Sequence, residues 1–256
     1  MNYLNKTAFI SCLNLGVLAA TASAQLVYQD NFDGPATTLN GVAPDVRPGS
    51  ETWASENLNA NGSISTGSMS SWLPYTFAED MEYTLTLSSN FAFDGQSSTP
   101  VYLGFTENSP FNTGNMMGFA QNTFGILAVT RGGGYEFLPG PNNDTPATAT
   151  GANSTLFNQS GVYDMQLVLT TYSTQDWTLT GYVDGVQIDL DSSSPGLVYT
   201  FTEAKNFTGI GMGYHSSTFT AEGFEFSEAA IPEPSTYALL GGSLALGLAF
   251  LRRRRA

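Results

Sequence analysis

The chain offers few side chains that could catalyse a reaction. His215 is its only histidine, so any Ser-His-Asp or Cys-His set would have to include it. A zinc site with several histidines is impossible. His215 follows a glycine-rich stretch and precedes two serines, which favours a place at a strand end or on the surface. The sequence also lacks a Gly-x-Ser-x-Gly nucleophile motif.

Pairs of carboxylates are the next candidates, because glycosidases place two of them across the sugar bond. The nearest acidic cluster, Glu79-Asp80-Met81-Glu82, lacks the Glu-x-Asp-x-x-Glu spacing that some sandwich-fold glycosidases carry on one strand. Glu222 and Glu225 are three residues apart, so we expect a strand to send them to opposite faces. These patterns predict that the protein is not an enzyme, and a polysaccharide-active enzyme is the weakest alternative.

Calcium is the one metal that the acidic residues suggest, since it prefers clustered oxygen ligands. Asp189 and Asp191 are two residues apart and would share a strand face, with Asp184 nearby. An exposed hairpin edge explains the same residues, and we favour that interpretation. No other cofactor is expected, because Gly209-x-Gly211-x-Gly213 departs from the dinucleotide fingerprint and instead indicates close backbone packing.

Three tryptophans, Trp53, Trp72 and Trp177, could stack on sugar rings. In a β-sandwich such residues usually belong to the core, and we expect that role for each. A carbohydrate-binding, lectin-like module is therefore the second alternative for function, with extracellular polysaccharide as its ligand and calcium as a candidate requirement.

The elements that position these residues read as short strands. Tyr83, Leu85 and Leu87 alternate with polar residues, as do the residues of 162–169 and 224–226. Asp184-Gly185 between residues 177–183 and 186–190 predicts a hairpin with a type I′ turn. Further strands are expected at 26–30 and 219–228, and a polar loop at 139–146. The fold class is therefore all-β.

The N-terminus has the parts of a secretory signal peptide. Lys6 is followed by an apolar stretch from residue 8 to about residue 20, and then by Ala22-Ser23-Ala24. Small residues at Ala22 and Ala24 fit signal peptidase, so we expect cleavage after Ala24. The only cysteine, Cys12, lies in this segment, and the mature protein therefore has no disulfide.

The C-terminus has the order of a sorting tail. Pro232-Glu233-Pro234 precedes an apolar segment, about 235–251, which has the minimum length of a transmembrane helix. Arg252, Arg253, Arg254 and Arg255 follow and favour the cytoplasmic side, which leaves the proline motif outside. The prolines keep that motif extended, in a form that a membrane-embedded enzyme could read.

This tail resembles the PEP-CTERM sorting signal of Gram-negative bacteria. The resemblance covers about a tenth of the chain and rests on the Pro-Glu-Pro motif, the apolar helix and the terminal arginines. It implies recognition by an exosortase, cleavage near the motif, and transfer from a transient membrane anchor to the cell surface or extracellular matrix.

The expected organisation is a signal peptide at 1–24, an ectodomain at 25–230 and the sorting tail at 231–256. The ectodomain holds three basic residues against 21 acidic ones, a formal charge of −18. The negative electrostatic field of this charge repels nucleic acid, so we exclude nucleic acid as a partner.

The ectodomain resembles the concanavalin A-like, laminin-G-like sandwich. The resemblance rests on Asp30-Asn31-Phe32 with Trp53, on the strands around 177–186, and on the glycine-rich stretch 209–213 before 224–226. It implies a two-sheet antiparallel jelly-roll in which the first and last strands are neighbours. The leading functional expectation is a non-enzymatic protein of the cell surface or matrix.

Overall fold

Alternating apolar residues along the chain form the strands of two antiparallel sheets. The computed structural model describes residues 23–64, 68–91, 101–107, 123–129, 134–139, 160–190, 197–201, 205–215 and 219–231. All regular elements within these ranges are strands, which confirms the all-β fold class. The signal segment 1–22 and the tail 232–256 lie outside the described residues, as does most of the predicted loop 139–146.

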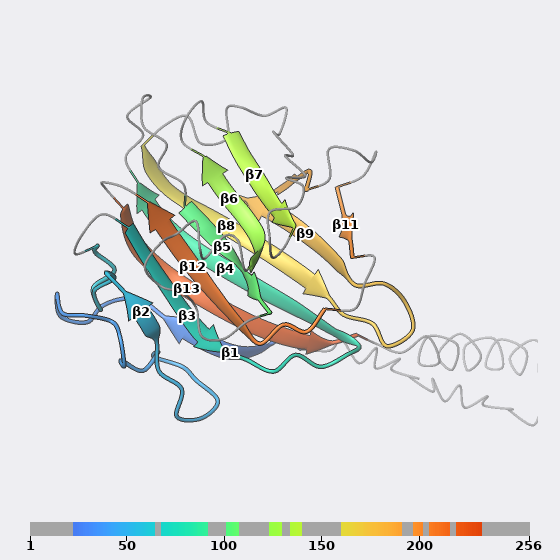
Figure 1. Ribbon diagram of the computed structural model, residues 1–256, viewed down its shortest axis with the longest axis horizontal. Helices are drawn as coiled ribbons and strands as arrows, with labels where there is room; N and C mark the ends of the chain where they lie inside the picture. The colour runs from blue at the N-terminus through green and yellow to red at the C-terminus, as the bar shows by residue number, and fades with distance from the viewer. Residues whose placement is uncertain are drawn as a thin grey trace, which may run out of the picture. The chain divides into compact units, whose positions relative to one another are not determined.

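The first sheet has seven strands in the order β1-β13-β4-β8-β9-β10, with β11 also paired to β9. The second has six strands in the order β2-β3-β12-β5-β6-β7. Figure 1 labels these strands, except for β10. The bounds of the first sheet are Gln25–Asp30 (β1), Phe219–Ala230 (β13), Met81–Phe91 (β4), Gly161–Thr170 (β8), Thr178–Val183 (β9), Val186–Ile188 (β10) and Tyr199–Thr200 (β11). Those of the second are Ala54–Glu56 (β2), Ser68–Pro74 (β3), Gly209–His215 (β12), Val101–Thr106 (β5), Thr123–Val129 (β6) and Gly134–Pro139 (β7).

The core lies between the two sheets, which form the predicted sandwich. Strand β8 shows how the alternation works: its odd-numbered residues from Tyr163 to Leu169 are buried, whereas Val162 is 56% exposed. Apolar side chains from the second sheet, such as Leu103, Ile210 and Met212, are buried in the same cluster. Each sheet therefore contributes one apolar face to a shared core.

The predicted hairpin joins β9 to β10. Val183 pairs with Val186 across the turn, and Asp184 and Gly185 have φ angles of 50° and 75°. Two successive positive φ angles are typical of a type I′ turn, which matches the twist of paired strands. The hairpin prediction is confirmed, although β9 begins one residue later and β10 ends two residues earlier than expected.

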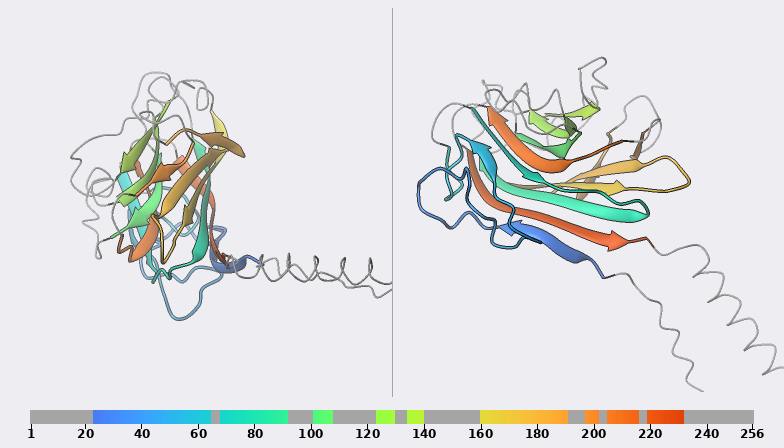
Figure 2. Two further views of the ribbon diagram at one scale, coloured as in Figure 1. Left: turned by 90° about the vertical axis from the view of Figure 1, so that its right-hand side faces the viewer. Right: turned by 60° about the horizontal axis from the view of Figure 1, so that its bottom comes forward.

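The first and last strands are neighbours, as the sequence resemblance implied. Gln25 pairs with Glu228 and Asp30 with Phe224, and on its other side β13 pairs with β4 along its whole length. Figure 2 shows β1 in blue beside β13 in orange-red, with β4 next to them. The residue after β13, Ile231, donates its backbone N–H to the carbonyl of Asp80 at 3.0 Å.

The described part of the chain contains no helix with the length and hydropathy of a membrane span. The segment for which we expect such a helix, 235–251, lies outside the described residues.

Candidate functional site

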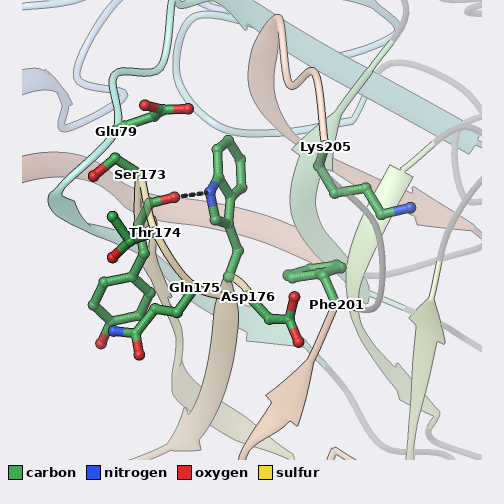
Figure 3. Close-up of a pocket in the computed structure, with 9 residues that line it drawn as sticks. Glu79, Ser173, Thr174, Gln175, Asp176, Phe201 and Lys205 are labelled. Atoms are coloured by element: carbon green, nitrogen blue, oxygen red, sulfur yellow. Dashed lines mark hydrogen bonds between the residues drawn. The ribbon is translucent and has the colours of Figure 1, made fainter.

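A cavity of about 370 Å³ lies beside the loop that joins β8 to β9. Residues 172–177 provide most of its wall, and Glu79, Phe201 and Lys205 complete it. Figure 3 shows Glu79, Ser173 and Thr174 on one side, with Asp176, Phe201 and Lys205 on the other. Segments distant in the sequence therefore meet at this one place.

Trp177 is the largest of the aromatic residues that line the cavity. Its indole Nε1 donates a 3.1 Å hydrogen bond to the carbonyl of Tyr172, and its ring packs against Phe207 with centroids 6.0 Å apart. The side chain is half-buried and rests on the core. Its polar edge is thus held within the protein, and the indole ring is fixed in the cavity wall.

Charged groups of both signs surround this ring. Glu79 and Asp176 are exposed carboxylate residues, and Lys205 Nζ lies 6.0 Å from the centroid of the Phe201 ring. Phe201 itself is only 1% exposed, so it supports the lysine rather than offering a free face. A fixed aromatic ring beside hydrogen-bond donors and acceptors suits a ligand with apolar and hydroxyl groups.

Asp80 connects the cavity wall to Ile231, the residue that follows the last strand. Its carbonyl accepts the hydrogen bond from Ile231, and its Oδ1 accepts one of 3.1 Å from the backbone N–H of Ser173. Hydrogen bonding from Ser173 lowers the pKa of the Asp80 carboxyl, because it stabilises the charged form. Asp80 has a φ of 57°, a left-handed conformation that aspartate tolerates in turns.

The predicted calcium residues are only partly described. Asp184 lies in the hairpin turn, and its Oδ1 accepts a 2.9 Å hydrogen bond from the backbone N–H of Asp164. The backbone of Asp189 exchanges hydrogen bonds with the hydroxyl of Tyr135, and Asp191 lies outside the described residues. Within the described ranges, no three His, Cys, Asp or Glu side chains gather as metal ligands. The calcium site stays a prediction.

The acidic pair on β13 differs from its sequence expectation. Glu222 and Glu225 are both exposed, whereas strand alternation was expected to separate them. The reason is an irregularity between Ala221 and Gly223, which allows Ala221 and Phe224 both to face the core although they are three residues apart. The expectation of opposite faces was wrong.

Several other candidates lie at strand ends or starts. His215 is the last residue of β12 and pairs with Ser68, a strand-end position as expected. Glu79 and Asp80 precede β4 and Glu82 lies near its start, all three exposed. Of the predicted processing residues, Ala24 lies just before β1. Those outside the described residues are Ala22, Pro232, Glu233, Pro234 and Arg252–Arg255.

The three tryptophans have different environments. Trp53 is 1% exposed and belongs to the core. Trp72 is 9% exposed and lies so close to Gly209 that a Cβ there would be 2.0 Å from its Nε1, which agrees with the expected close packing. Trp177 packs on the core but also lines the cavity, whereas the core role alone was favoured from the sequence. The polar run 173–176 directly before it was the available signal.

Comparison with known proteins assigns the tail. Residues 230–255 match the PEP-CTERM protein-sorting motif, so the predicted resemblance of the tail is confirmed. The motif indicates an exported protein that is sorted to the cell envelope. No curated protein sequence matches the chain.

Solved structures similar to this chain include carbohydrate recognition domains. That of Emp47p has 12% identity and a TM-score of 0.45, and covers 79% of this chain and 96% of its own. A lectin from Bauhinia forficata in complex with GalNAc has 12% identity and a TM-score of 0.43, with coverages of 82% and 100%. A Trypanosoma rangeli sialidase has 11% identity and a TM-score of 0.40, covering 82% of this chain but 31% of its own. At these values, the similarity does not indicate what this chain binds.

Proposed function

We propose that this chain is a non-enzymatic protein of the cell surface or extracellular matrix, delivered there by cleavage of its C-terminal tail. The observation that carries the proposal is the sorting motif at 230–255, which begins where the last strand ends. Signal peptidase removes residues 1–24. The helix at about 235–251 then anchors the chain transiently in the inner membrane of a Gram-negative cell, and Arg252–Arg255 hold the end of the chain in the cytoplasm. An exosortase-type enzyme then cleaves near Pro232-Glu233-Pro234.

The decisive experiment changes the motif and measures the mass of the protein recovered from the cell surface and medium. Glu233→Ala should leave the tail attached, so that the full-length membrane form accumulates. Glu225→Ala is the matched control, because Glu225 is exposed on β13 and outside the motif. Equal cleavage of the two variants would contradict the proposal.

A second candidate function is carbohydrate binding at the cavity beside Trp177. The observation that favours it is a fixed indole ring next to Glu79, Asp176 and Lys205. Sugar rings present C–H groups that pack on aromatic faces and hydroxyls that both donate and accept hydrogen bonds. The ectodomain carries a formal charge of −18, which repels acidic polymers. These features favour a neutral saccharide.

Binding can be tested on the mature ectodomain with an array of neutral, acidic and amino-sugar polymers, with and without calcium. Trp177→Ala and Asp176→Ala should both abolish the signal. Asp176 is exposed, so this second variant reports on binding if the first disturbs folding. Tyr182→Ala, on β9 outside the cavity lining, is the control. Absence of binding to every polymer would refute this candidate, and hydrolysis of a bound polymer would identify a polysaccharide-active enzyme instead.

A further inference from the structure

The Pro-Glu-Pro element of the sorting motif directly follows Ile231, the last residue of the described sandwich. Ile231 is held to Asp80 by a 3.0 Å backbone hydrogen bond, and Pro232 is the next residue. Three fully extended residues span at most about 10 Å. Any enzyme that encloses Pro232-Glu233-Pro234 therefore has to approach within that distance of Asp80.

This end of the sandwich is firmly tied together. Thr171 donates its backbone N–H to the Met81 carbonyl at 2.8 Å, and its hydroxyl donates to the carbonyl of Ala78 at 2.8 Å. Ser173 is bonded to the Asp80 carboxylate, as described above. These contacts join the start of β4 to the loop after β8, so the end of the fold is a preformed surface.

The exposed residues of this surface are acidic and polar. Glu79, Asp80, Glu82 and Asp176 are all exposed, and so are the polar residues 173–175 that precede Asp176 in the loop. A partner that packs here needs basic or donor-rich side chains, because like charges across an interface oppose binding.

We propose that this end of the ectodomain, formed by Glu79, Asp80, Glu82 and residues 173–176, is a docking surface for the membrane-embedded processing enzyme. The proposal rests on the proposed cleavage of the tail. The enzyme reads the extended motif and, at the same time, contacts the folded end through a basic rim. A rival explanation is that the C-terminal end of β13 separates from Glu82 and Met81 on β4, which lengthens the segment that the enzyme can reach. In that case the enzyme needs no contact with the folded end.

A steric test separates these explanations in cells that process the wild-type chain. Thr174→Arg adds bulk to an exposed loop position whose side chain makes no described hydrogen bond, and it should lower the cleaved fraction several-fold. Thr37→Arg is the control. Thr37 is exposed, and its carbonyl accepts a hydrogen bond from the backbone N–H of Ala60. Ala60 is close in sequence to Gly62, which is hydrogen-bonded to Ala221 near the start of β13. That end of β13 lies roughly 30 Å along the strand from Ile231.

A linker supplies the second measurement. A short Gly-Ser insertion between Ile231 and Pro232 moves the motif away from the surface. With this insertion, the Thr174→Arg chain should be cleaved to the same extent as a wild-type chain that carries the same insertion. Equal cleavage of Thr174→Arg and Thr37→Arg without the linker would overturn the docking surface. So would a linker that speeds cleavage of the wild type, because fraying would then be limiting.

The charge of the surface is tested by neutralising two of its carboxylates. Glu79→Gln with Glu82→Gln should slow cleavage, whereas the same change at Glu222 and Glu225, both exposed on β13, should not. Equal rates for the two pairs would contradict a basic partner. Glu233→Ala keeps the two proposals distinct: if it blocks cleavage while the surface variants are cleaved normally, only the docking surface fails.

Discussion

The indole Nε1 of Trp53 donates a 2.6 Å hydrogen bond to Oδ2 of Asp30, 23 residues earlier in the chain. The other carboxylate oxygen, Oδ1, accepts a 2.8 Å bond from the backbone N–H of Phe32. Asp30 is 6% exposed and Trp53 is 1% exposed, so this contact is buried. It ties the loop after β1, where Phe32 has a φ of 50°, to the core.

Replacing this carboxylate with an amide should destabilise the fold. Asp30→Asn retains one acceptor oxygen but places an NH₂ group opposite either Trp53 or Phe32, so one buried donor loses its partner. We expect a loss of about 1–3 kcal/mol in the free energy of unfolding, measured by urea titration. Asp33→Asn, at an exposed position nearby, is the control. Equal stability of the two variants would show that the contact contributes little.

The same carboxylate should make stability depend on pH. Burial raises the pKa of Asp30 above the ordinary aspartate value, although its hydrogen bonds lower it, and the charges of Asp45 and Asp33 raise it slightly further. The folded state therefore binds the proton more tightly than the unfolded chain. Protonation of Asp30 therefore contributes fully to stability below the pKa that this carboxyl has in the unfolded chain. The contribution is lost as the pH rises through the pKa that it has in the folded protein. The stability of the wild type relative to Asp30→Asn should thus increase on acidification from about pH 7 to about pH 3. A constant difference across that range would contradict it.

A methyl group at Gly209 should be costly. A Cβ there would meet Trp72 Nε1 at 2.0 Å and the Leu73 carbonyl at 2.7 Å, so backbone or indole has to shift. We expect a loss of about 1–3 kcal/mol for Gly209→Ala, measured by thermal and chemical unfolding. Gly161→Ala provides the comparison, because nothing lies within 4 Å of a Cβ at that strand position. If both variants unfold alike, the close contact with Trp72 is not a packing constraint.

Removal of calcium should leave the ectodomain unchanged. Asp184, the best described of the three candidate ligands, already accepts a hydrogen bond from Asp164 and stabilises the hairpin. We therefore expect the same melting temperature in chelator and in millimolar calcium. A rise of several degrees with calcium, lost in Asp189→Asn, would establish the metal site that the sequence suggested.

Much of the fold could be predicted because it follows from local patterns. The alternation in 162–169 identifies the buried face of β8, and Asp184-Gly185 identifies the hairpin, since both depend on neighbouring residues alone. The irregularity at Ala221 could not be anticipated, because it arises from the pairing of β13 with β4.

The candidate site was less accessible to sequence reasoning. Trp177 was expected in the core, and it does pack there, but its second role depends on Glu79 and Lys205 approaching from remote loops. Such contacts are determined by how the sheets stack and leave no local periodicity. The link between Asp80 and Ile231 has the same origin, since it joins residues 151 positions apart.

The position of β13 between β1 and β4 has a consequence for how the protein folds. Among the strands that the structure describes, β1 pairs only with β13, and β4 lacks one of its two neighbours until β13 is present. Pairings this distant in sequence slow folding, because a long loop must close before they form. A chain exported with its N-terminus first therefore cannot complete its larger sheet until almost the whole ectodomain has emerged. Folding would then finish at about the time when the sorting motif reaches the membrane.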